Sequence, residues 1–169
     1  MLQLTQKERM LLEDEKSHED MCIKKYKNYA QQAQDQQLKD LFNNHAQTEQ
    51  QHFDTLNQML QGQEPTMQQQ GQQQQQGQQQ GQQQGQQQGQ QQWQQQANNQ
   101  GTVNNSNDQL LCTDLLSTEK YISSGYDTAI FEMTNPAVRK TLQHIQQEEQ
   151  KHGEDLFNYL NSHGMYNVK

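Results

Sequence analysis

The sequence predicts an all-α protein, an antiparallel four-helix bundle made of two helical hairpins. Apolar residues recur at helical spacing in both ends of the chain. The two ends also repeat each other at an offset of 100 residues, which indicates an internal duplication. Between them lies a segment dominated by glutamine, which contains too few apolar residues to belong to a packed core.

The N-terminal arm, residues 1–62, is expected to hold the first pair of helices. Thr5 with Glu8 has the pattern of a capping box at the start of the first helix, and Asp35 is expected to begin the second. Gly62 is expected to end the second helix. The shared face of the first helix carries Leu12, Glu19, Cys22, Ile23, Tyr26 and Ala30. The stripe of the second carries Leu38, Leu41, Phe42, His45, Glu49, His52, Leu56 and Leu60.

The C-terminal arm, residues 108–169, repeats this plan. Ser106 with Gln109 repeats the capping pattern, and Asn135 followed by Pro136 predicts a cap with proline at the first helical position. The face of the first helix carries Leu111, Leu115, Glu119, Ile122, Tyr126, Ala129 and Ile130. The face of the final helix carries Val138, Leu142, Ile145, Glu149, His152, Leu156 and Leu160.

Residues 63–107 are predicted to be a disordered Gln/Gly-rich linker. From 68 to 96 every residue is Gln, Gly or Trp93, so the tract has almost nothing to bury in return for the entropy lost on folding. A flexible linker of about 45 residues spans about 37 Å, which is close to the length of a bundle of 25-residue helices at about 1.5 Å per residue. Either a short or a long crossover is therefore allowed, and the two hairpins are expected to form one domain.

Charge and composition exclude several classes of partner. The chain has 12 Lys and Arg against 20 Asp and Glu, a net charge of −8, which disfavours nucleic acid and anionic membranes. The opening MLQLTQKERM has no signal-peptide pattern, and no stretch is apolar enough for membrane insertion, so synthesis in the cytosol is expected. Cys22 and Cys112 are isolated and are interpreted as small core residues.

Acids and imidazoles on the apolar faces predict a metal centre. Each hairpin turns midway between its two aligned glutamates, so the four carboxylates should lie at one height, and each second helix adds a Glu-x-x-His pair. This is the ligand pattern of ferritin-like di-iron and di-manganese bundles. The predicted metal ligands are Glu19, Glu49, His52, Glu119, Glu149 and His152.

The charge of such a cluster favours two divalent ions. Buried carboxylates without counterions are unfavourable by several kcal/mol each, and two divalent ions would balance four of them. Carboxylate and imidazole ligands suit Fe or Mn, whereas paired thiolates for a structural zinc site are absent from the sequence. No organic cofactor is expected.

A second interpretation needs no metal. The Glu and His residues could lie at the edge of the apolar stripe, bound to Tyr26, Tyr126 or water. His45 could donate to a ligand but is interpreted first as an ordinary core histidine. Side chains expected on the solvated surface are Glu15, His18, His144, Glu148 and His163.

The C-terminal arm resembles the Coat F family of spore coat proteins from endospore-forming bacteria. The resemblance covers about 55 residues and is carried by DLLSTEKYISSGYDTAIFE, NPAVRKTLQHIQQEEQKH and the closing GMYNV. The N-terminal arm looks like the accompanying first hairpin of the ferritin-like superfamily. The resemblance implies a ferritin-like fold, synthesis in the mother-cell cytoplasm, and a place in the spore coat beside other coat proteins.

Two functions follow from these expectations. The first is a structural coat component whose Gln tract is a spacer, self-associates, or is cross-linked to lysines such as Lys24, Lys25 or Lys27, as the family context implies. The second is a dimetal redox enzyme acting on peroxide or oxygen, similar to manganese catalases or rubrerythrin. The sequence does not decide between a catalytic and a purely structural metal pair, and it identifies no catalytic residue.

Overall fold

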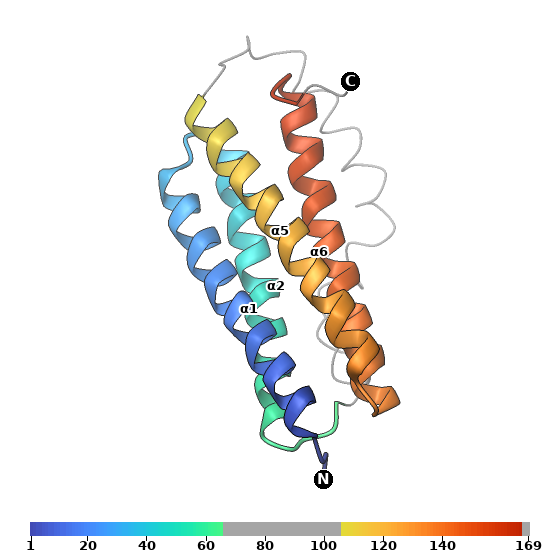
Figure 1. Cartoon of the computed structure of the whole chain (residues 1–169). Helices are drawn as coiled ribbons and strands as arrows, with labels where there is room; N and C mark the ends of the chain where they lie inside the picture. Colours follow the sequence, from blue (N-terminus) through green and yellow to red (C-terminus); the bar gives the residue numbers. More distant parts are fainter. Residues whose placement is uncertain (66–105, 167–169) are drawn as a thin grey trace, which may run out of the picture.

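The computed structural model describes residues 1–65 and 106–166, and within them the chain forms four α-helices. These are α1 (Gln6–Gln32), α2 (Gln36–Leu60), α5 (Ser106–Glu132) and α6 (Pro136–Ser162). Helices α1 and α2 form one hairpin and α5 and α6 the other, and neighbouring helices run antiparallel (Figure 1). The predicted all-α bundle of two hairpins is confirmed.

Local signals set most of the helix ends. The Thr5 and Glu8 capping box is formed in both directions at the start of α1, and Asp35 caps α2 by accepting from the amide of Gln37. Asn135 caps α6 ahead of Pro136. Gly62, just past α2, has a φ of 85°, a conformation that side chains with a Cβ rarely adopt.

The start of α5 differs from its prediction. Ser106 is already helical, and the side-chain amide of Gln109 donates to the carbonyl of Met165 at 2.9 Å instead of capping the helix start. Helix α5 begins at the end of the bundle opposite to the end of α2 (Figure 1). The predicted disordered linker falls mostly on residues 66–105, which lie outside the described residues.

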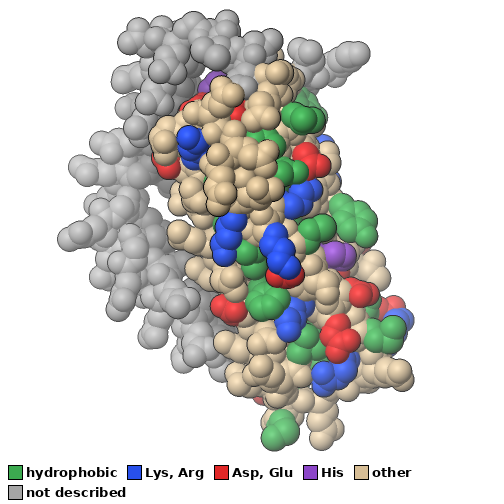
Figure 2. Space-filling view, turned by 90° about the vertical axis from the view of Figure 1, so that its left-hand side faces the viewer, with side chains coloured by type: hydrophobic (Ala, Val, Ile, Leu, Met, Phe, Trp, Pro, Cys, Tyr) green, Lys and Arg blue, Asp and Glu red, His purple; other side chains and the backbone are tan. Residues whose placement is uncertain are grey.

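The core is continuous between the four helices. Fully buried side chains come from every helix, among them Leu12, Phe42, Leu115 and Leu142. On the face that Figure 2 displays, acidic and basic side chains are interspersed and hydrophobic ones occur in small separate groups. Cys22 and Cys112 are buried, as predicted for small core residues, and both are free thiols.

Two acids join the hairpins at opposite ends of the bundle. Glu8 of α1 accepts from the amide and hydroxyl of Thr134, both at 2.8 Å, in the α5–α6 turn. Asp108 of α5 accepts from the amides of Gln34 and Asp35, both at 2.9 Å, in the α1–α2 turn. The two acids occupy equivalent positions of the duplication, so the hairpins are related by an approximate twofold axis.

Replacing Glu8 or Asp108 by alanine is expected to destabilise the bundle by about 1–3 kcal/mol each, because two hydrogen bonds from a turn to a buried carboxylate are lost. Urea unfolding measures the change. Glu13→Ala, at an exposed position of α1, is the matched control and should stay within about 0.5 kcal/mol of the parent. Equal effects for all three variants would contradict the assigned role.

The contribution of Glu8 should also depend on pH. Burial opposes its ionisation, but the hydrogen bonds from Thr134 and Thr5 prevail and lower its pKa from 4.5 to about 2. Its stabilising effect is therefore present above pH 4.5 and is lost as the pH falls towards 2.

Candidate metal centre

The six predicted ligand residues lie together in the middle of the bundle. Helix α1 provides Glu19 and α5 provides Glu119, while α2 and α6 each provide a Glu-x-x-His pair. None of the six is more than 4% exposed, so they are not at the edge of the apolar stripe. The six residues are Glu19, Glu49, His52, Glu119, Glu149 and His152.

The six side chains form two overlapping groups that could each hold a metal ion. Ligand atoms of Glu19, Glu49, His52 and Glu149 all lie within 4.8 Å of one another, and so do those of Glu49, Glu119, Glu149 and His152. Glu49 and Glu149 belong to both groups. Each group is completed by a glutamate and a histidine from one hairpin, and we call these the terminal pairs. They are Glu19 with His52 from α1–α2 and Glu119 with His152 from α5–α6.

Many ligand atoms of the cluster have no hydrogen-bond partner. These buried atoms are Oε2 of Glu19, Oε2 of Glu49, Nδ1 of His52, Oε2 of Glu119, and both carboxylate oxygens of Glu149. A buried polar atom without a partner is unfavourable by about 1–3 kcal/mol, and more when it is charged. Cations would satisfy these atoms together, so the cluster fits a metal centre in both charge and geometry.

Two tyrosines hold the terminal glutamates across the bundle. The hydroxyl of Tyr26 donates to Oε1 of Glu119, and the hydroxyl of Tyr126 donates to Oε1 of Glu19. Burial and the neighbouring carboxylates raise the pKa of both tyrosines well above the usual value, so both keep their protons. Each tyrosine fixes one carboxylate oxygen and leaves the other free for a cation. The interpretation that these glutamates bind tyrosines is therefore correct, and it is compatible with a metal.

The two histidines face the cluster through the same ring atom. Nδ1 of His52 lies 2.8 Å from Oε1 of Glu149, without the alignment of a hydrogen bond, and Nδ1 of His152 lies 2.9 Å from Oε1 of Glu49. Nε2 of His52 is bound to Glu148 at 2.8 Å. A carboxylate on the outer nitrogen is the usual arrangement for a metal-binding histidine, because it fixes the ring and its tautomer.

His45 breaks the twofold relation of the centre. Its ring stacks on that of His152 with centroids 4.1 Å apart, and its Nδ1 lies 3.2 Å from the Tyr26 hydroxyl. Its Nε2 lies 3.5 Å from Asp155. The equivalent position in the other hairpin is Ile145. His45 is therefore more than an ordinary core histidine, because it supports one ligand pair and has no counterpart beside the other.

Without cations the cluster takes up protons. Burial, followed by the neighbouring carboxylates, raises the pKa of Glu49 and Glu119 well above 4.5 and that of Glu149 to about 7. The pKa of Glu19 is lowered, because its interactions with Glu49, His52 and the Tyr126 hydroxyl together outweigh burial. Burial and two nearby imidazoles lower the pKa of His152, which keeps it in the neutral form that binds metals.

Glu15 and Glu148 are not on a solvated face, and the prediction for them is wrong. Glu15 is 3% exposed, and burial raises its pKa to about 6. Its carboxylate occupies the space that a side chain at Gly125 would fill, since a Cβ there would lie 2.6 Å from Oε1 of Glu15. Glu148 is half-buried because it binds His52. The periodicity of a single helix could not predict either contact, because Gly125 and His52 lie on different helices from Glu15 and Glu148.

No helix of the described residues carries an apolar stretch long enough to cross a membrane.

Comparison with known proteins finds a family match for the C-terminal part of the chain. Residues 107–169 match the Coat F domain. The chain is also 33% identical over 68 residues to the uncharacterized protein YusN of Bacillus subtilis (strain 168). This alignment covers 40% of this chain and 62% of YusN, so less than two thirds of that relative is spanned. No solved structure matches the chain. The ferritin-like assignment stays a prediction, whereas the predicted resemblance of the C-terminal arm to the Coat F family is confirmed by the match over residues 107–169.

Proposed function

We propose that the protein is a structural component of the spore coat whose helical bundle holds a dinuclear metal centre. The Coat F domain supports the coat assignment. The observation that carries the metal assignment is the set of buried carboxylate oxygens and the His52 nitrogen that have no hydrogen-bond partner.

The two overlapping groups suggest the role of each residue in that centre. Glu49 and Glu149 belong to both groups and would help to hold both ions, while Glu19 with His52 would hold one and Glu119 with His152 the other. Two divalent ions balance four carboxylates with neutral imidazoles, and oxygen and nitrogen ligands favour Fe or Mn. Such ions would tie both hairpins together, and when bound they would also supply one-electron redox chemistry.

Assembly with other coat proteins is the second part of the proposal. The Gln tract 68–96, outside the described residues, would provide acyl donors for cross-linking, self-associate, or act as a spacer. Of the lysines considered as acceptors, Lys24 and Lys27 are exposed. Lys25 is half-buried and is held by Asp114 and Thr118, both at 2.7 Å, so it is the weakest acceptor. Transglutaminase with a labelled amine tests the donors, and unlabelled glutamines in 68–96 would rule out this use.

Fractionation of spores tests the coat assignment. Antibodies against the protein should detect it in coat extracts of purified spores of the source bacterium and in the mother-cell cytoplasm earlier in sporulation. Detection in the spore core, or only in cells that do not sporulate, would contradict the proposal.

A redox enzyme is the alternative, and one observation favours it. A pocket between α5 and α6 reaches Glu119 and Glu149, as a catalytic metal centre requires. Peroxide consumption by the metal-loaded protein separates the two functions. The structural role predicts no turnover, whereas the enzyme predicts turnover that is lost in Glu49→Ala.

A further inference from the structure

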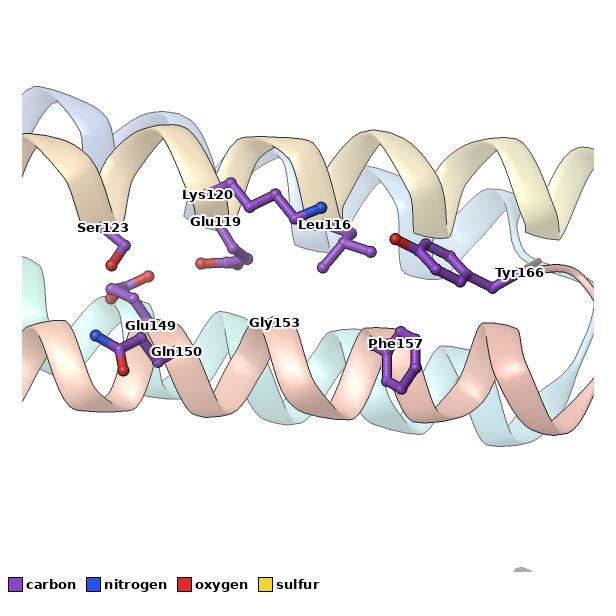
Figure 3. A pocket seen from close by; sticks show the side chains of 9 residues that line it. All are labelled: Leu116, Glu119, Lys120, Ser123, Glu149, Gln150, Gly153, Phe157 and Tyr166. Atoms are coloured by element: carbon purple, nitrogen blue, oxygen red, sulfur yellow. The ribbon is translucent and has the colours of Figure 1, made fainter. Parts of the chain in front are cut away.

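A pocket of about 490 Å³ opens between α5 and α6. Figure 3 shows Glu119 of α5 and Glu149 of α6 projecting into the space between the two helices. Both glutamates are buried and have carboxylate oxygens without partners. The pocket is also lined by the exposed residues Lys120 and Gln150, so it connects the protein surface with the candidate metal centre.

Gly153 keeps part of this space free. A glycine inside a helix is unfavourable by about 1 kcal/mol relative to alanine, which suggests a reason in the packing. A Cβ at Gly153 would lie 3.8 Å from Cδ1 of Leu116 and 3.9 Å from Cβ of Glu119, which is ordinary contact. Alanine therefore fits at this position, whereas a larger side chain would project into the pocket.

The equivalent place in the other hairpin is filled. The residue that corresponds to Gly153 is Phe53, and the one that corresponds to Leu116 is Lys16. The ammonium group of Lys16 lies 5.0 Å from the centre of the Phe53 ring and donates to Asn57 at 2.8 Å. The duplication has therefore diverged at these positions, with large side chains in α1–α2 and a gap in α5–α6.

We propose that this pocket is the route by which a small anionic ligand reaches the metal centre and binds to it. This inference rests on the proposed metal function. The pocket contacts Glu119 and Glu149, which belong to the group completed by His152, so the ligand would bind the ion of that group. The bound ion and Lys120 both favour an anion with an oxygen or nitrogen donor atom.

The rest of the lining limits the size and shape of the ligand. Phe157 and Tyr166 pack edge to face, with ring centroids 5.0 Å apart, at the end of the pocket away from the glutamates (Figure 3). This apolar end would accommodate a short aliphatic or aromatic group. The class that fits both ends is a small carboxylate, while a simpler inorganic anion fits the end at the glutamates alone.

Azide binding to the protein loaded with Co²⁺ tests the route without relying on turnover. Azide is the probe, and the change in the visible absorption of Co²⁺ reports its binding. Gly153→Phe and the smaller Gly153→Leu should slow azide binding by about tenfold or more, since either side chain fills the route. Gly153→Ala should bind azide within about twofold of the parent rate, because its Cβ makes only ordinary contacts.

Two further variants test the symmetry and the charge. Phe53→Gly, which removes the ring from the other hairpin, should not slow azide binding. Lys120→Gln should weaken azide binding severalfold, because it removes a positive charge from the lining. Cobalt content and thermal unfolding of each variant are measured in parallel, and only variants that are folded and fully loaded are compared.

The outcomes separate this inference from the function on which it rests. Failure of the parent protein to bind Co²⁺ would overturn both. Full cobalt loading, with azide binding that is equally fast in the parent and both bulky variants, would overturn the route alone. Slow binding in the bulky variants together with an unchanged rate in Gly153→Ala would support it.

Discussion

Glu49→Ala is expected to abolish metal binding, whereas Glu19→Ala should leave about one ion per chain. Glu49 belongs to both candidate groups, so its loss removes a ligand from each. Glu19 belongs to one group, and the other keeps Glu49, Glu119, Glu149 and His152. Isothermal titration with Mn²⁺ or Fe²⁺ under anaerobic conditions measures both stoichiometries.

The same variants should differ in thermal stability when metal is present. Free metal at 100 times its Kd stabilises the folded state by about 2.7 kcal/mol for each occupied site. The parent should therefore gain about twice as much from metal as Glu19→Ala, and Glu49→Ala should gain almost nothing. Glu13→Ala, on the exposed side of α1, serves as the control. Equal gains in Glu49→Ala and the parent would show that the metal binds elsewhere.

The second large effect is a loss of stability of the metal-free protein as the pH rises from about 4.5 to about 7. In this range Glu149 is protonated in the folded state, where its pKa is about 7, but ionised in the unfolded chain, where it is close to 4.5. The folded state then binds more protons, so stability falls as the pH rises, by about 1.4 kcal/mol for each pKa unit of such a group.

Other members of the cluster adjust this slope. Glu49 and Glu119 also have raised pKa values and act in the same direction. Glu19 has a lowered pKa, so its contribution is lost as the pH falls instead. His152, with a pKa lowered well below 6.5, is the member that opposes the slope, since the unfolded chain holds its proton up to about that pH. The three raised glutamates outnumber it, so the net slope above pH 4.5 stays negative.

Metal should reverse this dependence, because cations bind the ionised carboxylates and displace protons. Thermal unfolding with EDTA and with Mn²⁺, over the range from about pH 5 to about pH 8, measures the effect. The difference between the two melting temperatures should widen with pH. Glu49→Gln/Glu149→Gln should flatten the metal-free curve and show no response to Mn²⁺. A metal-free curve that rises across this range in the parent would contradict the account.

The sequence predicts the helices and the candidate ligands well, because both follow from periodicity within a single helix and from the duplication. Glu149 and His152 stand on one helical face, and the offset of 100 residues points to Glu49 and His52. The helix ends follow from local capping patterns, apart from α5. A serine followed three residues later by glutamine can occur at a helix cap or within the first turn, so the predicted pair Ser106 and Gln109 does not fix where α5 begins.

What the sequence did not reveal depends on contacts between hairpins. Glu8 has the pattern of an ordinary capping residue, and its bonds to Thr134 arise only when α1 lies beside the other turn. The duplication offers one usable signal for this role, because an acid occupies the same position in both halves of the chain, Glu8 in the first and Asp108 in the second. Glu15 is buried because Gly125 leaves space for it. The space left beside a glycine on another helix does not appear in the hydrophobic periodicity of the sequence.

Metal analysis of gently purified protein tests the central claim most directly. The account predicts about two ions of Fe or Mn per chain in the parent protein, as in other bundles with this ligand pattern. His52→Ala/His152→Ala should retain its helices but lose most of the metal, because it removes one terminal ligand from each group. A parent protein that binds no metal even when loaded with Fe²⁺ or Mn²⁺, or a double variant with the same metal content as the parent, would contradict the account.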